Sequence, residues 1–265
     1  MARYCYMAYL SFKSSIAYKA EVWFGIFTSV LTLSIQIFLW KALFQYGESN
    51  VGVSFDQMIT YFILSTALSL CLINSSVLDE IAKDIREGTI ANYLAKPYKY
   101  KISLLSKSLG RIFFSLLFVI MPMIIISSIF FTIQAPHSLV SLLATILISI
   151  CSFYIFFSIY YIAGLSTFWF MGMQGAIGLL IENILRLLSG ALIPIWIFPK
   201  WLYTIASYLP VRYGFDVPIS IYIGRTAGSD IVKGIAVQFI WILSLIIVDN
   251  IVWRISIRKL VIQGG

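Results

Sequence analysis

Residues 77–111 read VLDEIAKDIREGTIANYLAKPYKYKISLLSKSLGR and form the one long polar stretch in a chain that is otherwise mostly apolar. Leu78 and Ile81 begin an apolar stripe at helical spacing, while charged residues occupy most of the remaining helix surface. Gly88 is a natural end for that helix, and a second short turn after it must end before Pro97. The stretch therefore predicts two short helices joined by a sharp corner.

The pattern by itself leaves two interpretations of this segment open. It is either a solvated loop at a membrane surface or a docking surface for a soluble partner. Lys83 can pair with Asp79 and Glu87, each one helical turn away, and such pairs stabilise a surface helix under either interpretation. The rest of the chain has to decide between the two.

Composition places the chain in a membrane. Of its 265 residues 60% are hydrophobic and only 11% are charged, and the mean hydropathy is +0.94, whereas soluble domains carry about 25% charged residues. The net charge is +8, but no basic run interleaves with a soluble fold, so nucleic acid is not an expected partner. Three scattered cysteines and a single histidine indicate neither a disulfide framework nor a metal site.

Apolar runs of about 20 residues cross a bilayer, and the chain holds six of them. We predict an all-α polytopic membrane protein whose single transmembrane domain spans residues 1–265. Residues 2–20 carry an apolar line opposed by basic and polar residues, which predicts a helix lying in the membrane interface. The predicted transmembrane helices are residues 22–44, 58–76, 112–133, 139–161, 165–193 and 232–253.

The distribution of lysine and arginine predicts the orientation. With a cytoplasmic N-terminus, thirteen of the 19 basic residues fall on the cytoplasmic side and five on the other, with Arg186 inside a span. Both termini and residues 77–111 are therefore expected in the cytoplasm of a cell-membrane protein. The thirteen are Arg3, Lys13, Lys19, Lys83, Arg86, Lys96, Lys99, Lys101, Lys107, Arg111, Arg254, Arg258 and Lys259.

Residues 189–228 depart from a simple succession of spans and loops. Four of the seven prolines lie here, so no continuous helix can cross the segment, yet it stays apolar and aromatic. Broken helix at membrane depth is tolerated only where it is buried in protein or lines a wet cavity. We predict one or two short re-entrant helices in the outer leaflet.

Charged residues within predicted spans are few. Glu182 and Arg186 lie four residues apart, the favourable order for an ion pair on one helix. Because an intramembrane charge is costly, we expect the two to be paired and to face the bundle interior. The pair is either structural or part of a substrate path or subunit seam. Asp249, near the cytoplasmic end of the last span, is expected to be interfacial.

The sequence contains none of the nucleotide-binding or catalytic motifs that we searched for. The sequence contains no glycine–lysine dipeptide and hence no Walker A loop, and it contains neither H-E-x-x-H nor G-x-S-x-G. We therefore expect no catalytic residue, cofactor or metal in this chain. The chain has the features of a conduit or scaffold, and if its work consumes energy, that energy has to come from elsewhere.

Two stretches resemble a known family. DIREGTIANYLAKPYKYKISLLSKSLGR is similar to the cytoplasmic segment of type-2 ABC exporter permeases, and LSGALIPIWIFPKWLYTIASYLP is similar to their outer-leaflet segment. Val211 and Arg212 follow Pro210 where many relatives have phenylalanine, which leaves the substrate open. The predicted span number, interfacial helix and re-entrant helices also fit that architecture, so the resemblance covers most of the chain.

The resemblance implies roles for particular residues. It implies a cytoplasmic coupling helix whose docking surface for the ATPase subunit includes Asp84, Arg86, Glu87, Gly88 and Thr89. The matching residues of the re-entrant segment are Gly190, Pro194, Pro199, Trp201 and Pro210. It also implies two permeases, identical or paralogous, in contact with membrane lipid and with ABC ATPase subunits that bind ATP and magnesium.

The expected function is the permease subunit of an ATP-driven exporter that moves an amphipathic substrate outward. Lipid-linked sugar, amphipathic peptide, antibiotic and lipid all remain open as substrates. The alternative is a stand-alone secondary transporter or channel, which would predict an inverted repeat and several intramembrane ionisable residues. The sequence shows no such repeat and one charged pair. An intramembrane enzyme is disfavoured because no catalytic set is present.

Overall fold

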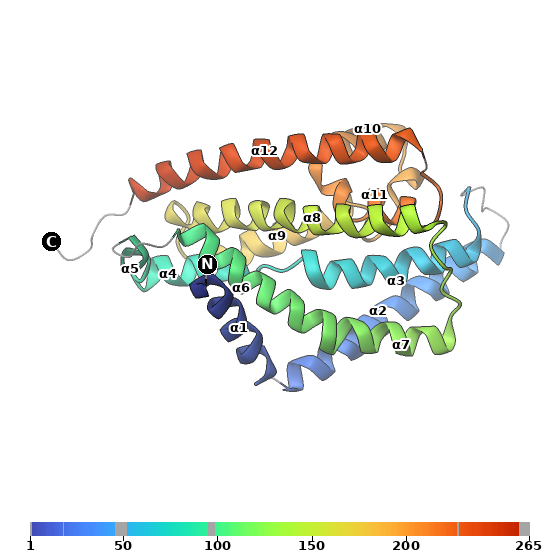
Figure 1. Ribbon diagram of the computed structural model, residues 1–265, viewed down its shortest axis with the longest axis horizontal. Coiled ribbons are helices and arrows are strands. Elements are labelled where there is room, and N and C mark those ends of the chain that lie inside the picture. Colours follow the sequence, from blue (N-terminus) through green and yellow to red (C-terminus); the bar gives the residue numbers. More distant parts are fainter. Residues whose placement is uncertain (1, 18, 46–51, 95–98, 227, 260–265) are drawn as a thin grey trace.

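The chain folds into a bundle of long helices with short helices at its two ends (Figure 1). The computed structural model describes residues 2–17, 19–45, 52–94, 99–226 and 228–259. Every regular element in these ranges is helical, as predicted. The α-helices are α1 (Ala2–Ile16), α2 (Lys19–Gln45), α3 (Phe55–Leu72), α4 (Ser76–Arg86), α5 (Ile90–Leu94), α6 (Tyr100–Ser115), α7 (Met121–Phe130), α8 (Leu139–Leu165), α9 (Gln174–Leu188), α10 (Lys200–Tyr208), α11 (Asp216–Tyr222) and α12 (Ser229–Ile257).

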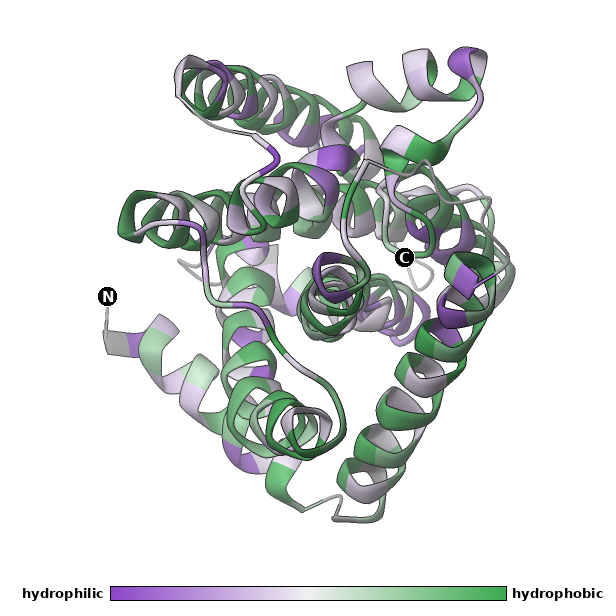
Figure 2. Ribbon diagram, turned by 90° about the vertical axis from the view of Figure 1, so that its right-hand side faces the viewer, coloured by the Kyte–Doolittle hydropathy of each residue, from purple (hydrophilic) through white to green (hydrophobic). Residues whose placement is uncertain are grey.

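Five helical stretches among the described residues are long and apolar enough to cross a membrane. In each of them less than half of the most apolar 18-residue window is buried inside the bundle, as expected for helices that face lipid, and Figure 2 shows hydrophobic residues over much of the helical surface. These five stretches are Val22–Gln45, Phe55–Arg86, Tyr100–Phe130, Leu139–Phe168 and Ser229–Ile257.

The predicted fifth span, residues 165–193, is not one helix. Leu165 ends α8, a 3-10 turn continues to Phe168, and the helix stops before α9 begins at Gln174. Gly172 takes a φ of +83° in this break, a conformation that only glycine adopts without strain. Residues 169–173 are as apolar as a transmembrane helix, but they form a tight turn. The 15 residues of α9 are fewer than a bilayer crossing usually needs, so the count of six is not confirmed.

The third predicted span contains Pro122 and nevertheless continues as helix. A π-helical turn at Leu116–Ile120 precedes the proline, and the Met121 amide donates to the carbonyl of Leu116 five residues earlier. Proline lacks an amide hydrogen and clashes with the carbonyl four residues before it, and a wider turn relieves both problems. The helical path therefore runs from α6 through the π turn into α7.

Two helix pairs pack closely along their sides. α1 lies along α6, where a Cβ on Gly110 would stand only 2.1 Å from the carbonyl oxygen of Ala8, so glycine is what permits this approach. α12 packs along α8, and the buried Gln238 donates to the Ile148 carbonyl at 2.9 Å. Figure 1 shows α1, α4, α5 and the C-terminal end of α12 at one end of the molecule.

Candidate functional site

The amphipathic helix predicted at the start of residues 77–111 is α4, and its apolar stripe anchors it. Leu78 and Ile81 are fully buried, and Gly164 of α8 makes room for them. A Cβ on Gly164 would stand 2.6 Å from Ile81 Cδ1 and 3.2 Å from Leu78 Cα. The close fit between α4 and α8 makes α4 part of the bundle rather than a loose surface loop.

The predicted corner is present at Gly88, which has a φ of +67° between α4 and α5. Asp84 holds this corner from the end of α4: its Oδ1 accepts a hydrogen bond from Thr89 Oγ1 at 2.7 Å. Arg86, Glu87 and Gly88 are exposed at its outside. The five predicted docking residues thus divide into an exposed tip, defined as residues 86–88, and a pair that fixes its shape. The second short helix, α5, ends at Leu94, and Pro97, before which it was predicted to end, lies outside the described residues.

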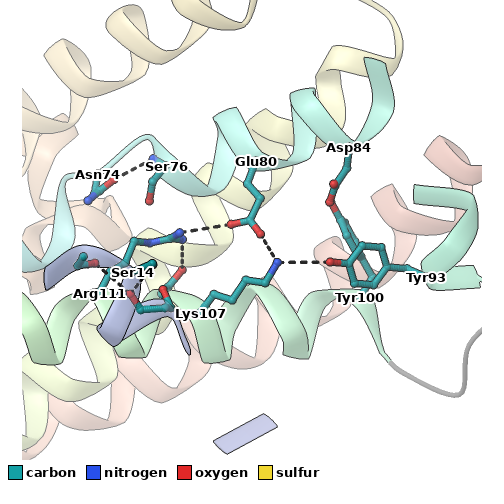
Figure 3. Close-up of polar contacts among 12 residues, drawn as sticks. Ser14, Asn74, Ser76, Glu80, Asp84, Tyr93, Tyr100, Lys107 and Arg111 are labelled. Atoms are coloured by element: carbon teal, nitrogen blue, oxygen red, sulfur yellow. Dashed lines mark hydrogen bonds and ion pairs between the residues drawn. The ribbon is translucent and has the colours of Figure 1, made fainter. Parts of the chain in front are cut away.

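A charged cluster fastens α4 to α6 (Figure 3). Glu80 accepts from Lys107 Nζ and, at 3.3 Å, from Arg111 Nη1. Lys107 also donates to Tyr93 of α5 at 3.3 Å. In the described structure Lys83 makes no ion pair with Asp79 or Glu87, so the predicted pairs within the helix are replaced by pairs between helices.

The start of α6 is in turn joined to α12. The Tyr100 ring stacks on that of Trp253 with centroids 5.3 Å apart. In the next position Lys101 forms an ion pair with Asp249, whose side chain is completely buried. Ser158 of α8 also donates to Asp249 Oδ2 at 2.7 Å.

The interfacial depth expected for Asp249 stays a prediction; the structure adds that its side chain is completely buried against neighbouring helices. It lies eight residues before the end of α12 and faces α6 and α8. The sequence did contain a signal that could have located it, namely a carboxylate placed inside an apolar span together with a lysine near the start of another helix. Choosing Lys101 among the basic residues of residues 77–111 required the fold.

Glu182 and Arg186 both lie half-buried on α9, which contacts α4 and α8. No ion pair joins the two side chains in the described structure, contrary to the predicted pairing. One turn of helix brings such residues onto one face without fixing their rotamers. Their structural or transport role remains a prediction.

The proline-rich segment consists of short helices at the opposite end of the bundle from α4 and α5 (Figure 1). Pro194 precedes a 3-10 turn, Pro199 precedes α10, and Pro210 opens a further 3-10 turn. The proline breaks thus lie where they were predicted. Trp201 on α10 has 66% of its surface exposed, so it points away from the bundle.

Gly190 positions the start of this segment against α3. Its φ is +91°, and its carbonyl accepts from Tyr61 Oη at 2.7 Å. A neighbouring carboxylate, Asp216, is buried and accepts from Arg212 Nη2 at 3.1 Å. The segment is thus a packed element with its own ion pair.

The described residues contain no group of three histidine, cysteine, aspartate or glutamate side chains arranged to hold a metal ion. The site is a charged tip exposed at the end of a buried helix. Hydrogen bonds, an ion pair and ring stacking connect this helix to α6 and α12. That arrangement can pass a displacement of the tip to two long helices.

In a comparison with protein-family models, residues 30–264 match the family described as ABC-2 family transporter protein. This range covers most of the chain, from within α2 to beyond α12. No curated protein matches the sequence.

Proposed function

The chain belongs to the ABC-2 family of transporter proteins, and on that premise we propose that it is the permease subunit of an ATP-driven exporter powered by a separate nucleotide-binding subunit. ABC-2 permeases are transmembrane, non-catalytic subunits. The sequence supports a separate motor because it contains no Walker A loop.

The exposed tip at residues 86–88 carries the proposal. It presents one positive and one negative side chain at the end of α4, next to the corner at Gly88. Complementary charges at an interface steer and orient a partner more than they add affinity. A soluble ATPase subunit that engages this tip would press on a helix whose apolar face is fully buried against α8.

The contacts behind the tip connect it to two long transmembrane helices. Asp84 accepts from Tyr100 Oη at 2.8 Å, and Tyr100 stacks on Trp253. Lys101 and Asp249 add an ion pair beside this stack. A rigid-body shift of α4 would therefore displace the start of α6 and the cytoplasmic third of α12 together.

The topology we infer has six crossings, with α9 as a short fifth one. Support comes from Figure 1, where α9 begins near the α4 end of the bundle and leads toward α10 and α11 at the other. The lysine and arginine distribution supports placing α4, α5 and both termini in the cytoplasm. In that orientation α10 and α11 form the outer-leaflet re-entrant segment of a cell-membrane protein.

The assembly we propose contains two permeases, identical or paralogous, and two ATPase subunits that bind ATP and magnesium. The substrate is amphipathic and moves outward. The competing function is a secondary transporter or channel that works alone. The two differ in one respect that can be measured, because only the exporter stops when a companion ATPase stops hydrolysing nucleotide.

The proposal is tested by reversing both charges of the tip, Arg86→Glu with Glu87→Arg, in the permease co-expressed with its companion ATPase subunit. Membrane insertion and thermal stability should be retained, since both side chains are exposed, while ATP hydrolysis loses its coupling to transport. The matched control reverses an exposed pair elsewhere, Asp230→Lys with Lys233→Asp on α12. Unchanged coupling in the tip variant would count against the docking role.

A further inference from the structure

A cavity of about 380 Å³ opens between α3, α6, α8 and α11 within the span region. Its walls are almost entirely apolar, with Leu68 of α3, Leu116 of the π turn and Leu142 of α8 among them. At membrane depth such a cavity is not filled by water, which would have too few hydrogen-bond partners there. Its occupant must be apolar.

This cavity continues into a smaller polar one toward the α4 end of the bundle. The two share Cys71, Leu72, Ile112 and Phe153 in their walls. The smaller one is lined in addition by polar side chains from the break between α3 and α4, from the first residue of α4 and from α6. These polar side chains are Asn74, Ser76, Ser108, Arg111 and Ser115, with Tyr160 of α8.

The polar end lies at the level expected for lipid head groups. The outer ends of α3 and α7 are level, because Thr132 donates to Asp56 Oδ1 at 3.2 Å. A hydrocarbon core of about 30 Å takes about 20 helical residues. Counting that number inward from Phe55 ends at Asn74, and counting it back from Phe130 ends at Arg111.

At this level two basic side chains pair with one carboxylate, so one positive charge is not neutralised. Lys107 and Arg111 share the single carboxylate of Glu80, so the three groups together carry a net positive charge. Figure 3 shows Asn74 and Arg111 on the same side of Glu80, away from Tyr93. In the described structure the Asn74 side chain uses its oxygen to accept from the Ser76 amide, and its nitrogen has no acceptor.

We propose that this two-part cavity, the head–tail groove, binds a single amphiphile with an anionic phosphate head at Arg111 and Asn74 and an acyl chain between α3, the π turn and α8. Guanidinium and amide donors suit phosphate oxygens. The apolar arm suits the hydrocarbon. This inference builds on the proposed exporter and names its substrate class: an acyl phospholipid-like molecule taken from the inner leaflet.

The test uses the purified permease in detergent with two photoactivatable lipids, phosphatidic acid and phosphatidylcholine, which carry the same diazirine-labelled acyl chain. After irradiation, peptide mapping by mass spectrometry locates the adducts. We expect adducts on Leu68 and Leu116 at much lower concentrations of phosphatidic acid than of phosphatidylcholine. Arg111→Gln should lower phosphatidic acid labelling about tenfold, the value of one charge-assisted hydrogen bond. Arg254→Gln, an exposed arginine near the same end of the bundle, should leave the labelling unchanged.

A matched tryptophan pair tests the apolar arm. Leu142 lines the cavity, while its neighbour Leu143 is 59% exposed on the outside of the same helix. Leu142→Trp should fill the cavity and abolish the groove adducts, whereas Leu143→Trp should keep them. If Leu142→Trp fails to fold, the wild-type map and Arg111→Gln still decide the question.

Three outcomes would overturn the inference: equal labelling by the two lipids, adducts spread evenly over outward-facing residues, or adducts that link the groove residues to a second copy of the chain. Because labelling requires neither ATP nor an ATPase, its failure leaves the docking proposal standing. Conversely, charge reversal at Arg86 and Glu87 should leave lipid labelling unchanged, so the two proposals fail separately.

Discussion

Tyr100 Oη donates to Asp84 Oδ2 at 2.8 Å, which joins the end of α4 to the start of α6 across a chain separation of 16 residues. The same carboxylate holds the corner through Thr89, and the same ring stacks on Trp253 of α12. One residue pair therefore connects the exposed tip to two long helices. The first prediction concerns this pair.

Tyr100→Phe keeps the ring on Trp253 but removes the hydroxyl from its part-buried contact with Asp84. A hydrogen bond to a charged group contributes about 1.5–3 kcal/mol, so the free energy of unfolding should fall by about that amount. Thermal unfolding of the detergent-solubilised protein measures the effect. Tyr9→Phe, at a ring that is 56% exposed on α1, is the matched control and should leave stability unchanged. Equal melting temperatures for the two variants would contradict the assigned role.

Asp249→Asn tests the buried ion pair with Lys101. Removing one partner of a buried pair costs about 3–5 kcal/mol because the other charge is left uncompensated. Asp230→Asn removes an ion pair of the same helix whose side chains are 73% and 66% exposed, and its cost should stay below about 1 kcal/mol. Replacing both buried partners, Lys101→Met with Asp249→Leu, should recover most of the lost stability. If the double variant is less stable than Asp249→Asn alone, the ion pair is not the cause.

Gly164→Ala tests the fit of α4 on α8. The added methyl group would stand 2.6 Å from Ile81, and overpacking of this kind costs about 1–3 kcal/mol. Gly175→Ala on α9 meets nothing within 4 Å, so it should be neutral or slightly stabilising. Denaturation midpoints compare the two. A harmless Gly164→Ala would show that α4 is held less tightly than its contacts indicate.

Much of this architecture follows from local sequence. The helix from 76 to 86, the corner at Gly88 and the proline breaks at 199 and 210 all follow from residue types whose backbone preferences are strong. Five of the spans followed from the length of their apolar runs. The prediction failed at residues 165–193, because hydropathy cannot distinguish an apolar turn at Gly172 from a continuous helix.

The site was less predictable than the fold. That Arg86 and Glu87 are exposed follows from the helical pattern, whereas the contact of Asp84 with Tyr100 and of Lys101 with Asp249 does not. These contacts join residues from helices far apart in the chain, and no periodicity specifies which lysine meets which carboxylate. Glu182 and Arg186 were expected to pair and do not, because spacing on one helix does not fix the rotamers of the two side chains.

The most direct measurement of the central claim is site-specific photocrosslinking in cells, with p-benzoylphenylalanine in place of Glu87 at the tip or Tyr208 on α10. Both positions are exposed and they lie at opposite ends of the bundle. The account predicts that the Glu87 position yields an adduct containing a Walker-type ATPase and that the Tyr208 position yields none. Absence of that adduct at Glu87, or an equal yield at Tyr208, would contradict it.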